Sequence, residues 1–307
     1  MSKVVAVLAS DIHFSHNAPI ARSAEPDWYK AMGRQVAEVS CLCAKHRAPL
    51  IIAGDIFDRW NSPPELINFA LAVFRTLGMA NGKGIYAIPG QHDLPNHRLA
   101  EVNRSAYDTL VLGGAIRNLF EETEIESGVV LQPFPWGSTL VNWEPDLGDT
   151  IYVAVMHRYI WNLQSGYPGA PIQNREDTLR KMMSGYDVIH GGDNHKSVLG
   201  VYGGRPLVFN PGSFYRRKQD ERNHKPCVGL LTVDGGVEVH YLDVSQDKWI
   251  DETLEKKVHT VIADTVIHEL QGLGPDSLDF REALAKEIRR RNIEESVRTV
   301  ILKSLEN

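Results

Sequence analysis

The chain has 307 residues, of which 43% are hydrophobic and 23% are charged, and its formal net charge is -6. This composition is typical of a globular protein with one large domain and an appendage, or with two domains. It excludes a generally basic nucleic-acid binder, although a local basic groove stays compatible with a negative net charge. Three cysteines cannot form a complete disulfide framework, which favours a reducing compartment.

No segment signals export or membrane insertion. The apolar run at residues 4–9 is shorter than the core of a secretory signal, which takes roughly 7–15 residues, and it runs straight into Asp11. No apolar run approaches the about 20 residues that a spanning helix needs. We therefore expect a cytoplasmic protein that has no membrane partner.

Short β-branched runs alternate with helical patterns, which predicts an α/β fold. Strands are expected at residues 4–9, 50–53, 84–88, 129–134, 151–156 and 186–190. An apolar stripe predicts a helix over residues 27–47, formed by Trp28, Met32, Val36, Val39, Leu42 and Cys43. Cys41 and Cys43 fall inside this helix, so we expect neutral thiols there rather than metal ligands. A second helix should begin at "SPPEL", where Ser62 can cap, Pro63 suits the first turn and Glu65 completes a capping box.

The pattern changes in the last third of the chain. Strand and turn signals run from Ser197 to about Val244, and "VDGGVEVHYLDV" (233–244) predicts a hairpin. After Trp249 come charged helical segments, the first with an apolar stripe of Leu254, Val258, Ile262, Val266 and Leu270. Such a stripe must be buried, either on the chain's own core or in a dimer or partner interface. The expected division is a domain over residues 1–247 and a helical C-terminal segment over residues 248–307.

Carboxylates, histidines and an amide follow five of the predicted strands. They are Asp11 and His13, then Asp55 and Asp58, then Gln91, His92 and Asp93, then His157, and finally Asp193 and His195. Taken singly, each has a plainer interpretation, such as a helix cap for Asp11 or Asp55, a surface or hydrogen-bonded histidine, or a loop amide. In α/β sheets, however, ligand sites lie beyond the carboxyl ends of strands. Five such placements together predict one shared metal site.

The side-chain types in this set favour a particular chemistry. Mixed carboxylate and imidazole ligands suit Mn, Fe, Zn or Mg better than a thiolate site would. Two such ions, about 4 Å apart, need an anionic bridging ligand, and they activate water while holding the oxygens of an in-line displacement. A phosphate ester brings negative charge that the ions and strand-end amides can accept. The sequence therefore predicts metal-dependent hydrolysis of phosphate esters.

The order Asp-x-His, Gly-Asp-x-x-Asp, Gly-x-His-Asp, His, Gly-x-x-His resembles the calcineurin-like metallophosphoesterases over roughly residues 4–215. Within them, "AGDIFDRWNSPPE", "VVLQPFPW" and "FNPGS" are most similar to the SbcD-type DNA exonuclease subunit. The resemblance implies a four-layer α-β-β-α sandwich with a C-terminal helical appendage. It also implies a DNA exonuclease or endonuclease with two divalent ions, Mn²⁺ first and Mg²⁺, Fe or Zn as alternatives. DNA, a second copy of the chain and an SbcC-like ATPase are its implied partners.

The resemblance also implies roles for the site residues. One ion would be held by Asp11, His13 and His195, with Asp55 as the bridging ligand, and the second ion by Gln91, His157 and Asp193. His92 would face the substrate, where it stabilises the transition state or protonates the leaving oxygen. Asp93 either supports His92 or caps its loop. Asp58 is either a further substrate-side residue or a structural one.

This chain departs from the family pattern at two positions of the second ion. The family usually has Asn where Gln91 stands and His where Asp193 stands. Gln keeps a carbonyl oxygen on a longer stem, and Asp offers a charged oxygen in place of an imidazole. Loss of the second ion is an alternative, and so is its binding by His190 in place of Asp193.

Other functions stay open at the level of the sequence. The basic run "YRRKQDERNHK" (215–225) could contact phosphates, or it could be a solvated loop balanced by Asp220 and Glu221. The alternatives to a DNA nuclease are a small-molecule phosphatase or phosphodiesterase and a non-catalytic scaffold with a weakened second metal site. The retained ligand pattern argues against the scaffold.

Overall fold

The computed structural model describes residues 2–125, 128–144, 148–200, 204–272, 288 and 293–305. The chain divides into two compact units. The first unit consists of Met1–Ser15, Met32–Arg216 and His224–Val244. The second unit consists of His16–Ala31, Arg217–Asn223 and Ser245–Asn307. This division differs from the one expected at residue 247, because two earlier segments join the C-terminal part.

The first unit contains two sheets, each with six strands. The first sheet has the order β12-β11-β1-β2-β3-β4, with β1 at Val4–Ala9, β2 at Leu50–Ala53, β3 at Ile85–Ile88, β4 at Arg117–Asn118, β11 at Cys227–Thr232 and β12 at Val237–Tyr241. Strands β1 to β4 pair in parallel, and β11 pairs with β1 in the antiparallel sense. The carboxyl ends of β1, β2 and β3 therefore point the same way.

The second sheet has the order β5-β6-β7-β8-β10-β9. Its strands are β5 at Thr123–Ile125, β6 at Val129–Phe134, β7 at Ile151–His157, β8 at Val188–Gly192, β9 at Val198–Gly200 and β10 at Leu207–Asn210. The four central strands are parallel, and the two edge strands β5 and β9 are antiparallel. Each sheet thus has a parallel centre, which is the arrangement expected of an α/β fold.

The hydrophobic core lies between the two sheets. Side chains of the first sheet, such as Ile51 and Ile88, form one buried cluster with Val153, Val188 and Phe209 of the second sheet. Because parallel strands are buried on both faces, they read as continuous apolar runs in the sequence. All six residues of β1 and all four of β2 are buried, so the two buried strands expected there are confirmed.

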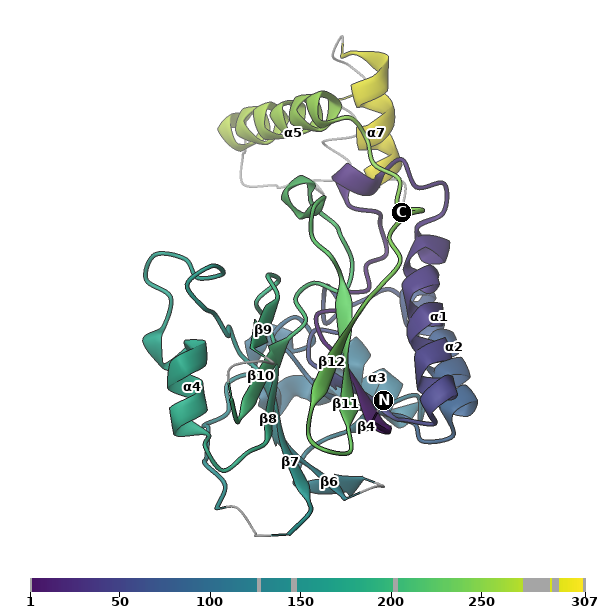
Figure 1. Cartoon of the computed structure of the whole chain (residues 1–307). Helices are drawn as coiled ribbons and strands as arrows, with labels where there is room; N and C mark the ends of the chain where they lie inside the picture. The colour runs from purple at the N-terminus through teal and green to yellow at the C-terminus, as the bar shows by residue number, and fades with distance from the viewer. Residues whose placement is uncertain are drawn as a thin grey trace. The chain divides into compact units, whose positions relative to one another are not determined.

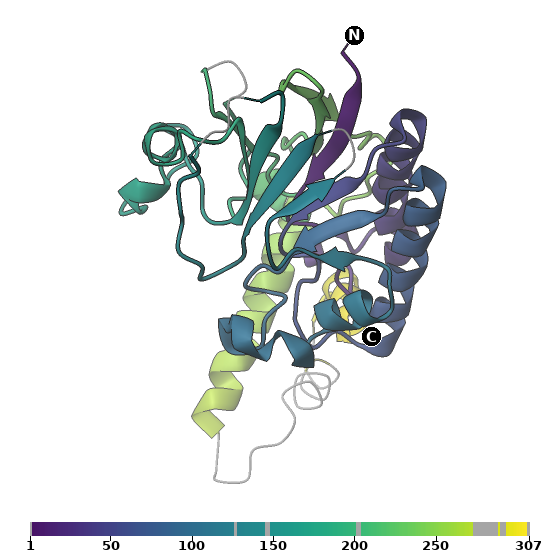
Figure 2. The same ribbon diagram turned by 90° about the horizontal axis from the view of Figure 1, so that it is seen from below.

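Helices cover the outer faces of the sheets. Helices α1 (Trp28–His46) and α2 (Pro64–Asn81) lie along the first sheet in both views (Figures 1 and 2). On the other side α4 (Glu176–Met182) covers the second sheet, where Leu179 packs with Ile189. A short helix α3 (Ala106–Leu112) and the 3₁₀ turns Pro95–His97, Leu99–Arg104 and Ile172–Asn174 complete this unit. The α-β-β-α order that the sequence predicted is confirmed.

The two long helices test the sequence predictions in detail. In α1, the predicted stripe is buried at Trp28, Met32, Val36, Val39 and Cys43, while Leu42 is only partly buried. The predicted start of α2 is wrong by one residue. The helix begins at Pro64 with Pro63 in extended conformation as its N-cap, and no side chain caps it. The hydroxyl of Ser62 lies one residue too early to cap and donates instead to the carbonyl of Arg59 at 2.8 Å.

The predicted hairpin at residues 233–244 is confirmed for its turn and its second strand. The turn lies between Thr232 and Val237, and β12 follows it. The first strand, β11, precedes the predicted range. The prediction missed the first strand because Gly235 and Gly236 indicate a turn but give no information about the apolar strand that precedes it.

The second unit has its own small core. Its elements are the 3₁₀ turns Ile20–Arg22 and Gln219–Glu221 and the helices α5 (Glu252–Gly272) and α7 (Glu295–Leu305). From the predicted stripe of α5, Val258 is buried together with Val297 and Ile301, and Leu254 and Ile262 pack against this cluster. The side chains of Val266 and Leu270 lie outside the described part of the chain. No helix in the described ranges is long and apolar enough to cross a membrane.

Candidate metal centre

Every candidate ligand stands at the carboxyl end of a strand in the first unit. Asp11 and His13 follow β1, Asp55 follows β2, Gln91 follows β3, His157 ends β7, and Asp193 and His195 follow β8. Strand β2 of the first sheet lies against β7 and β8 of the second. The strand ends of both sheets therefore meet at one rim, and the convergence expected from the sequence is found in the structure.

The backbone at this rim adopts conformations that side chains other than glycine rarely take. Asp11, His13, Asp55 and Asp193 have φ values of 49°, 48°, 52° and 81°. Hydrogen bonds between loops hold two of them, from the N–H of Asp11 to the carbonyl of Gly54 (3.1 Å) and from the N–H of His13 to the carbonyl of Asp55 (2.9 Å). Left-handed backbone at a cluster of polar residues is characteristic of functional sites.

Two glycines allow the ligand loops to approach closely. A Cβ atom on Gly90 would lie 2.2 Å from Oδ1 of Asp55, and one on Gly54 would lie 2.2 Å from Nδ1 of His157. Any larger residue at either place would push a ligand side chain out of position. Steric crowding therefore explains the glycine in the Gly-Asp segment (Gly54) and the glycine in the Gly-x-His segment (Gly90).

The first group of ligands is formed by Asp11, His13 and His195. One donor atom of each lies within 4.8 Å of the others, and the Nε2 atoms of the two histidines are 3.0 Å apart. The Asp11 carboxylate accepts hydrogen bonds from the hydroxyl of Ser10 (2.6 Å) and from the N–H of Asp193 (2.9 Å). Ser10 was not among the predicted site residues, and its only signal is that it directly precedes a carboxylate at a strand end.

The carboxylate of Asp55 lies between the two groups. Its Oδ2 is 3.6 Å from Nε2 of His13 and 3.3 Å from Nε2 of His157. Its Oδ1 accepts a hydrogen bond from the N–H of His92 at 2.9 Å, which fixes the orientation of the carboxylate. One carboxylate oxygen of Asp55 thus faces an imidazole on each side.

Three buried polar atoms at the rim test whether these residues fit metal ions. Oε1 of Gln91 has no hydrogen-bond partner in the described part of the chain, and Oδ2 of Asp55 and Nε2 of His157 face each other at 3.3 Å without a well-formed hydrogen bond. Buried polar atoms nearly always have partners, so three together need an explanation. Nδ1 of His157 lies 2.7 Å from the carbonyl of Ala53 and donates to it, so Nε2 of the neutral ring is left to bind a cation. The donor set fits divalent ions.

The electrostatics of the cluster point the same way. Burial, with a contribution from Asp55, raises the pKa of Asp11 to about 7. Burial alone would lower the pKa of His157, but Asp55, Asp11 and Asp193 raise it to about 10. Burial disfavours the ionised form of Asp55 as well, yet His157 and His92 hold its pKa below the usual value. The cluster thus concentrates negative charge, and a divalent cation can replace the protons that would otherwise balance it.

The two exchanged positions contact each other. Nε2 of Gln91 donates a hydrogen bond of 2.7 Å to Oδ1 of Asp193. This bond fixes the amide so that Oε1 of Gln91 is the buried atom that needs a partner. The longer Gln91 side chain thus reaches the shorter Asp193 side chain across the rim.

His92 and Asp58 lie on the open side of the centre. The partly exposed ring of His92 stands edge-on to the ring of His13, with 4.9 Å between the centroids, and its Nδ1 lies 2.9 Å from the carbonyl of Asp58. The carboxylate of Asp58 is 3.8 Å from Nδ1 of His13. Asp58 therefore contacts His92 through its carbonyl and His13 through its carboxylate, and it can position both rings.

Asp93 is placed differently from its neighbour. It is fully buried, and its carboxylate accepts hydrogen bonds from the N–H groups of Ile56, Phe57 and Gly90. Burial and the nearby Asp55 raise its pKa to about 7. These contacts favour the loop-capping alternative for Asp93, since its carboxylate holds the loops after β2 and β3 together.

His190 does not face the rim. It is fully buried inside β8, and its Nε2 lies 3.0 Å from the carbonyl of Ala9. Burial lowers its pKa to about 4. This placement does not support the alternative in which His190 binds the second ion instead of Asp193.

Aromatic side chains that the sequence analysis did not assign to the site stand beside it. The ring centroid of Trp136, just after β6, is 6.4 Å from that of His157, and the ring of His97 is 6.5 Å from Trp136. Tyr159 and Tyr167, in the loop after His157, are in edge-to-face contact at 5.0 Å. Trp136 stands two residues after the predicted strand at 129–134, a signal that could have found it, whereas Tyr167 carries no such signal.

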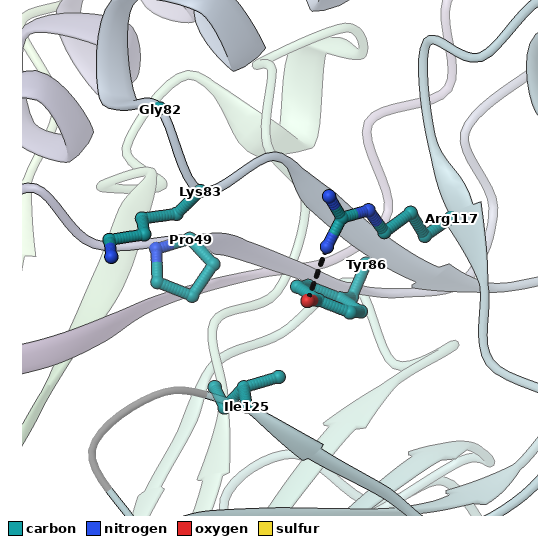
Figure 3. A pocket seen from close by; sticks show the side chains of 6 residues that line it. All are labelled: Pro49, Gly82, Lys83, Tyr86, Arg117 and Ile125. Carbon is teal, nitrogen blue, oxygen red and sulfur yellow. Dashed lines mark hydrogen bonds between the residues drawn. The ribbon is translucent and has the colours of Figure 1, made fainter.

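A small hollow lies at the opposite ends of the strands. It has a volume of about 90 Å³ and is lined by Pro49, Gly82, Lys83, Tyr86, Arg117 and Ile125. Inside it the guanidinium of Arg117 donates to the hydroxyl of Tyr86 at 2.7 Å (Figure 3). Because Pro49 and Gly82 precede β2 and β3, this hollow is no part of the metal centre.

The basic run at residues 215–225 is largely engaged in contacts within the protein. Arg217 is buried, and its N–H and that of Lys218 donate to Glu221. The guanidinium of Arg222 lies over the ring of Trp249, 5.1 Å from its centroid, and donates to the carbonyl of Ile250. These contacts give two of its arginines a structural role and do not support the run as a loop of free cations.

Comparison with known proteins gives one finding. The family model described as calcineurin-like phosphoesterase matches residues 5–292. No curated protein matches the chain. The matched range includes all the candidate ligands described above.

Proposed function

Because the chain belongs to the calcineurin-like phosphoesterase family, we propose that it is a two-metal phosphodiesterase of SbcD type that hydrolyses DNA. Metal-dependent hydrolysis of phosphate esters is the chemistry that the family implies, and the cluster of Asp and His residues could hold the ions. The observation that carries the two-ion part is the position of Asp55, whose Oδ2 faces His13 and His157 from between them.

The proposed ligand sets follow the two groups of side chains. Asp11, His13 and His195 bind one ion, Gln91, His157 and Asp193 bind the other, and Asp55 contacts both. When bound, two divalent ions supply a nucleophile from water at neutral pH and offset the charge of the phosphate. Mn²⁺ is our first choice, because the second set has three oxygen donors and one imidazole, and such donors suit harder ions.

The remaining polar residues orient the substrate and move a proton. Nδ1–H of His92 donates to the carbonyl of Asp58 and so orients the ring, and Nε2 is the ring atom that would pass a proton to the leaving oxygen. The carboxylate of Asp58 is 3.8 Å from Nδ1 of His13, too far for a hydrogen bond, and it supports that ring through its charge alone. Neither residue needs to bind an ion for this role.

The proposal is tested by incubating the protein with MnCl₂ and two substrates, bis(4-nitrophenyl) phosphate and end-labelled DNA. We expect hydrolysis of both, and its loss on addition of EDTA. Hydrolysis of the diester alone would show a small-molecule phosphodiesterase. Absence of all hydrolysis in protein with measured Mn²⁺ content would show a scaffold.

Two variants sharpen the test. Asp55→Asn keeps the shape of the side chain but removes the bridging charge, so we expect loss of Mn²⁺ and of hydrolysis together. His240→Ala is the matched control, since His240 lies on β12, where it contacts Glu38 at 3.0 Å. Hydrolysis by this control should equal that of the parent.

A further inference from the structure

Asn194 stands between two candidate ligands that belong to different ions. It follows Asp193, from the proposed ligand set of the second ion, and it precedes His195, from that of the first. Its side chain is only 2% exposed. A primary amide buried this deeply needs hydrogen-bond partners for both its nitrogen and its oxygen. The identity of those partners shows what the residue holds in place.

The two ends of the Asn194 amide contact two different segments. Nδ2 donates to the carbonyl of Ile160 at 2.7 Å, and Oδ1 accepts from the N–H of Lys196 at 3.1 Å. The second bond closes a local turn around His195, which is a common role for asparagine. The first bond spans 34 positions in the chain and reaches the segment that follows His157. Asn194 therefore joins the loop after β8 to the loop after β7.

The carbonyl that receives this bond lies on a well-packed segment. Ile160 is fully buried, and its N–H donates to the carbonyl of Arg158 at 2.7 Å. Its side chain occupies the space that a larger residue at Gly191 would need, since a Cβ atom there would lie 2.3 Å from Cδ1 of Ile160. The bond from Asn194 is thus anchored in the core at its far end.

The loop is held from its other side by the segment that follows β10. Nδ2 of Asn210, which is fully buried at the end of β10, donates to the carbonyl of Asn194 at 2.8 Å. Three residues later, the N–H of Ser213 donates to the carbonyl of His195 at 3.1 Å, and the next N–H in the chain donates to the carbonyl of Asp11 at 3.1 Å. The backbone around Asn194 is therefore linked to the ligands of the first ion as well.

We propose that Asn194 is a positioning residue that fixes the two ion sites relative to each other. The inference rests on the proposed function and adds a residue to its machinery. Without the amide, the loop with Asp193 and His195 loses its tie to the segment after His157, so the ligands of both ions lose their mutual placement. The plainer interpretation is a turn residue that stabilises the fold. That interpretation requires a change in stability but no change in the affinity for Mn²⁺.

Calorimetric titration of MnCl₂ into metal-free Asn194→Ala separates the two interpretations. We expect the dissociation constants of both ions to rise about 10- to 100-fold, the range typical for the loss of a residue that supports metal ligands. Asn81→Ala is the matched control. Asn81 is also buried, and it also accepts from one N–H (Lys83, 2.8 Å) and donates to one carbonyl (Gly84, 3.2 Å), but it lies at the other ends of the strands. This control should lower the midpoint of urea unfolding in EDTA and leave Mn²⁺ binding unchanged.

Asn194→Asp tests the same point with a side chain of nearly the same size. It keeps an acceptor for the N–H of Lys196 but places a carboxylate oxygen opposite the carbonyl of Ile160, so that the two oxygens repel each other. The added negative charge would by itself tighten the binding of a cation. We expect weaker binding of both Mn²⁺ ions. Such a loss has the opposite sign to the effect of the charge and therefore reports displaced ligands.

The outcomes separate this inference from the proposed function. Dissociation constants in Asn194→Ala equal to those of the parent would overturn the inference, and so would tighter binding in Asn194→Asp. Weaker binding of one ion alone would show that Asn194 positions a single site, which also overturns it. The proposed function is judged by the parent protein. If the parent binds two Mn²⁺ ions but hydrolyses neither substrate, that function is overturned and the role of Asn194 in metal binding stands.

Discussion

His92 and Asp93 are neighbours in the sequence but lie in different environments. The ring of His92 is held on the open side of the centre by the carbonyl of Asp58, while its neighbour Asp93 is buried under the loops. We expect His92→Ala to lower kcat by about 10²–10⁴-fold, because it removes a proton donor. Metal content should stay close to that of the parent. Elemental analysis that shows loss of metal in this variant would make His92 a ligand.

The hydrogen bond between Gln91 and Asp193 makes these two residues interdependent. We expect Asp193→His alone to weaken binding of the second Mn²⁺ about 10- to 100-fold, since an imidazole no longer offers Gln91 a carboxylate oxygen at that place. Gln91→Asn combined with Asp193→His should restore part of the affinity and broaden the choice of metal. Calorimetric titration of Mn²⁺ into each variant measures this.

One result of the same titration would contradict this prediction. If Asp193→Ala binds two Mn²⁺ ions as tightly as the parent, Asp193 is a turn residue and not a ligand. Its φ of 81° would then be the reason for its presence, since Asp tolerates left-handed backbone.

At the level of elements, strand β8 carries a pH-sensitive residue. Burial lowers the pKa of His190 to about 4, so the folded state binds fewer protons than the unfolded state between pH 4 and about 6.5. Stability is therefore full above the unfolded pKa and falls as the pH drops below it. Between pH 7.5 and pH 5 this one histidine should cost about 2 kcal/mol.

His190→Gln tests this prediction, because the amide still offers a donor to the carbonyl of Ala9 but does not titrate. Urea unfolding in EDTA at both pH values gives the comparison. The parent should lose about 2 kcal/mol more than the variant on acidification. An equal loss in both proteins would show that the metal-site residues alone account for the pH dependence.

In the second unit, one buried arginine links two segments that are distant in the sequence. The guanidinium of Arg22 is 2.6 Å from Glu25 and 2.8 Å from Asp247, and it lies over the rings of Trp28 and Trp249. We expect Arg22→Ala to cost about 3–5 kcal/mol, because it leaves buried carboxylates without their partner. Hydrogen exchange of residues 245–262 should report this loss.

An exposed pair is the control for that prediction. Arg175 and Asp177 form an ion pair whose side chains are 35% and 54% exposed. Removing it with Arg175→Ala should change stability far less than Arg22→Ala does, since water screens such pairs. Similar exchange rates in both variants would mean that the Arg22 contacts contribute little.

The sequence predicted an element correctly where burial alone set the spacing of its apolar residues. Apolar runs gave β1 and β2, and the stripe from Trp28 to Cys43 gave α1, because burial sets the spacing of these residues. Local capping chemistry was less informative, since Ser62 satisfied the pattern for a cap but stands one residue too early. The Gln91–Asp193 bond joins residues 102 positions apart in the chain, and Trp136 approaches His157 from another strand. Such contacts depend on the packing of two sheets, which no local pattern contains.

At the scale of the whole molecule, the C-terminal segment forms a hydrophobic core of its own, and this role is separate from the interface that the sequence suggested as an alternative. Val258, Val297 and Ile301 form the core of the second unit, and Ile20 packs against it. Homodimerisation and an ATPase partner stay proposals. We expect truncation after Asp247 to lower solubility, for two reasons. It exposes Ile20, and it removes the residues after Asp247 that contact the guanidinium of Arg22.

Light scattering and hydrolysis of bis(4-nitrophenyl) phosphate measure the effect of that truncation. The full chain is the reference for both mass and rate. A truncated protein that stays soluble and active, with an unchanged mass distribution, would argue against any interface role for residues 248–307.

The position of β1 has a consequence for how the protein is made. β1 pairs with β2 on one side and with β11 on the other, so one of its neighbours emerges from the ribosome early and the other only after residue 232. During translation the nascent chain therefore holds an apolar strand with one open edge, and such edges invite pairing with other chains. The strand that carries Asp11 and His13 at its end thus keeps one edge open until β11 has been synthesised. Slower elongation between the codons for β2 and β11 should increase aggregation of the newly made protein.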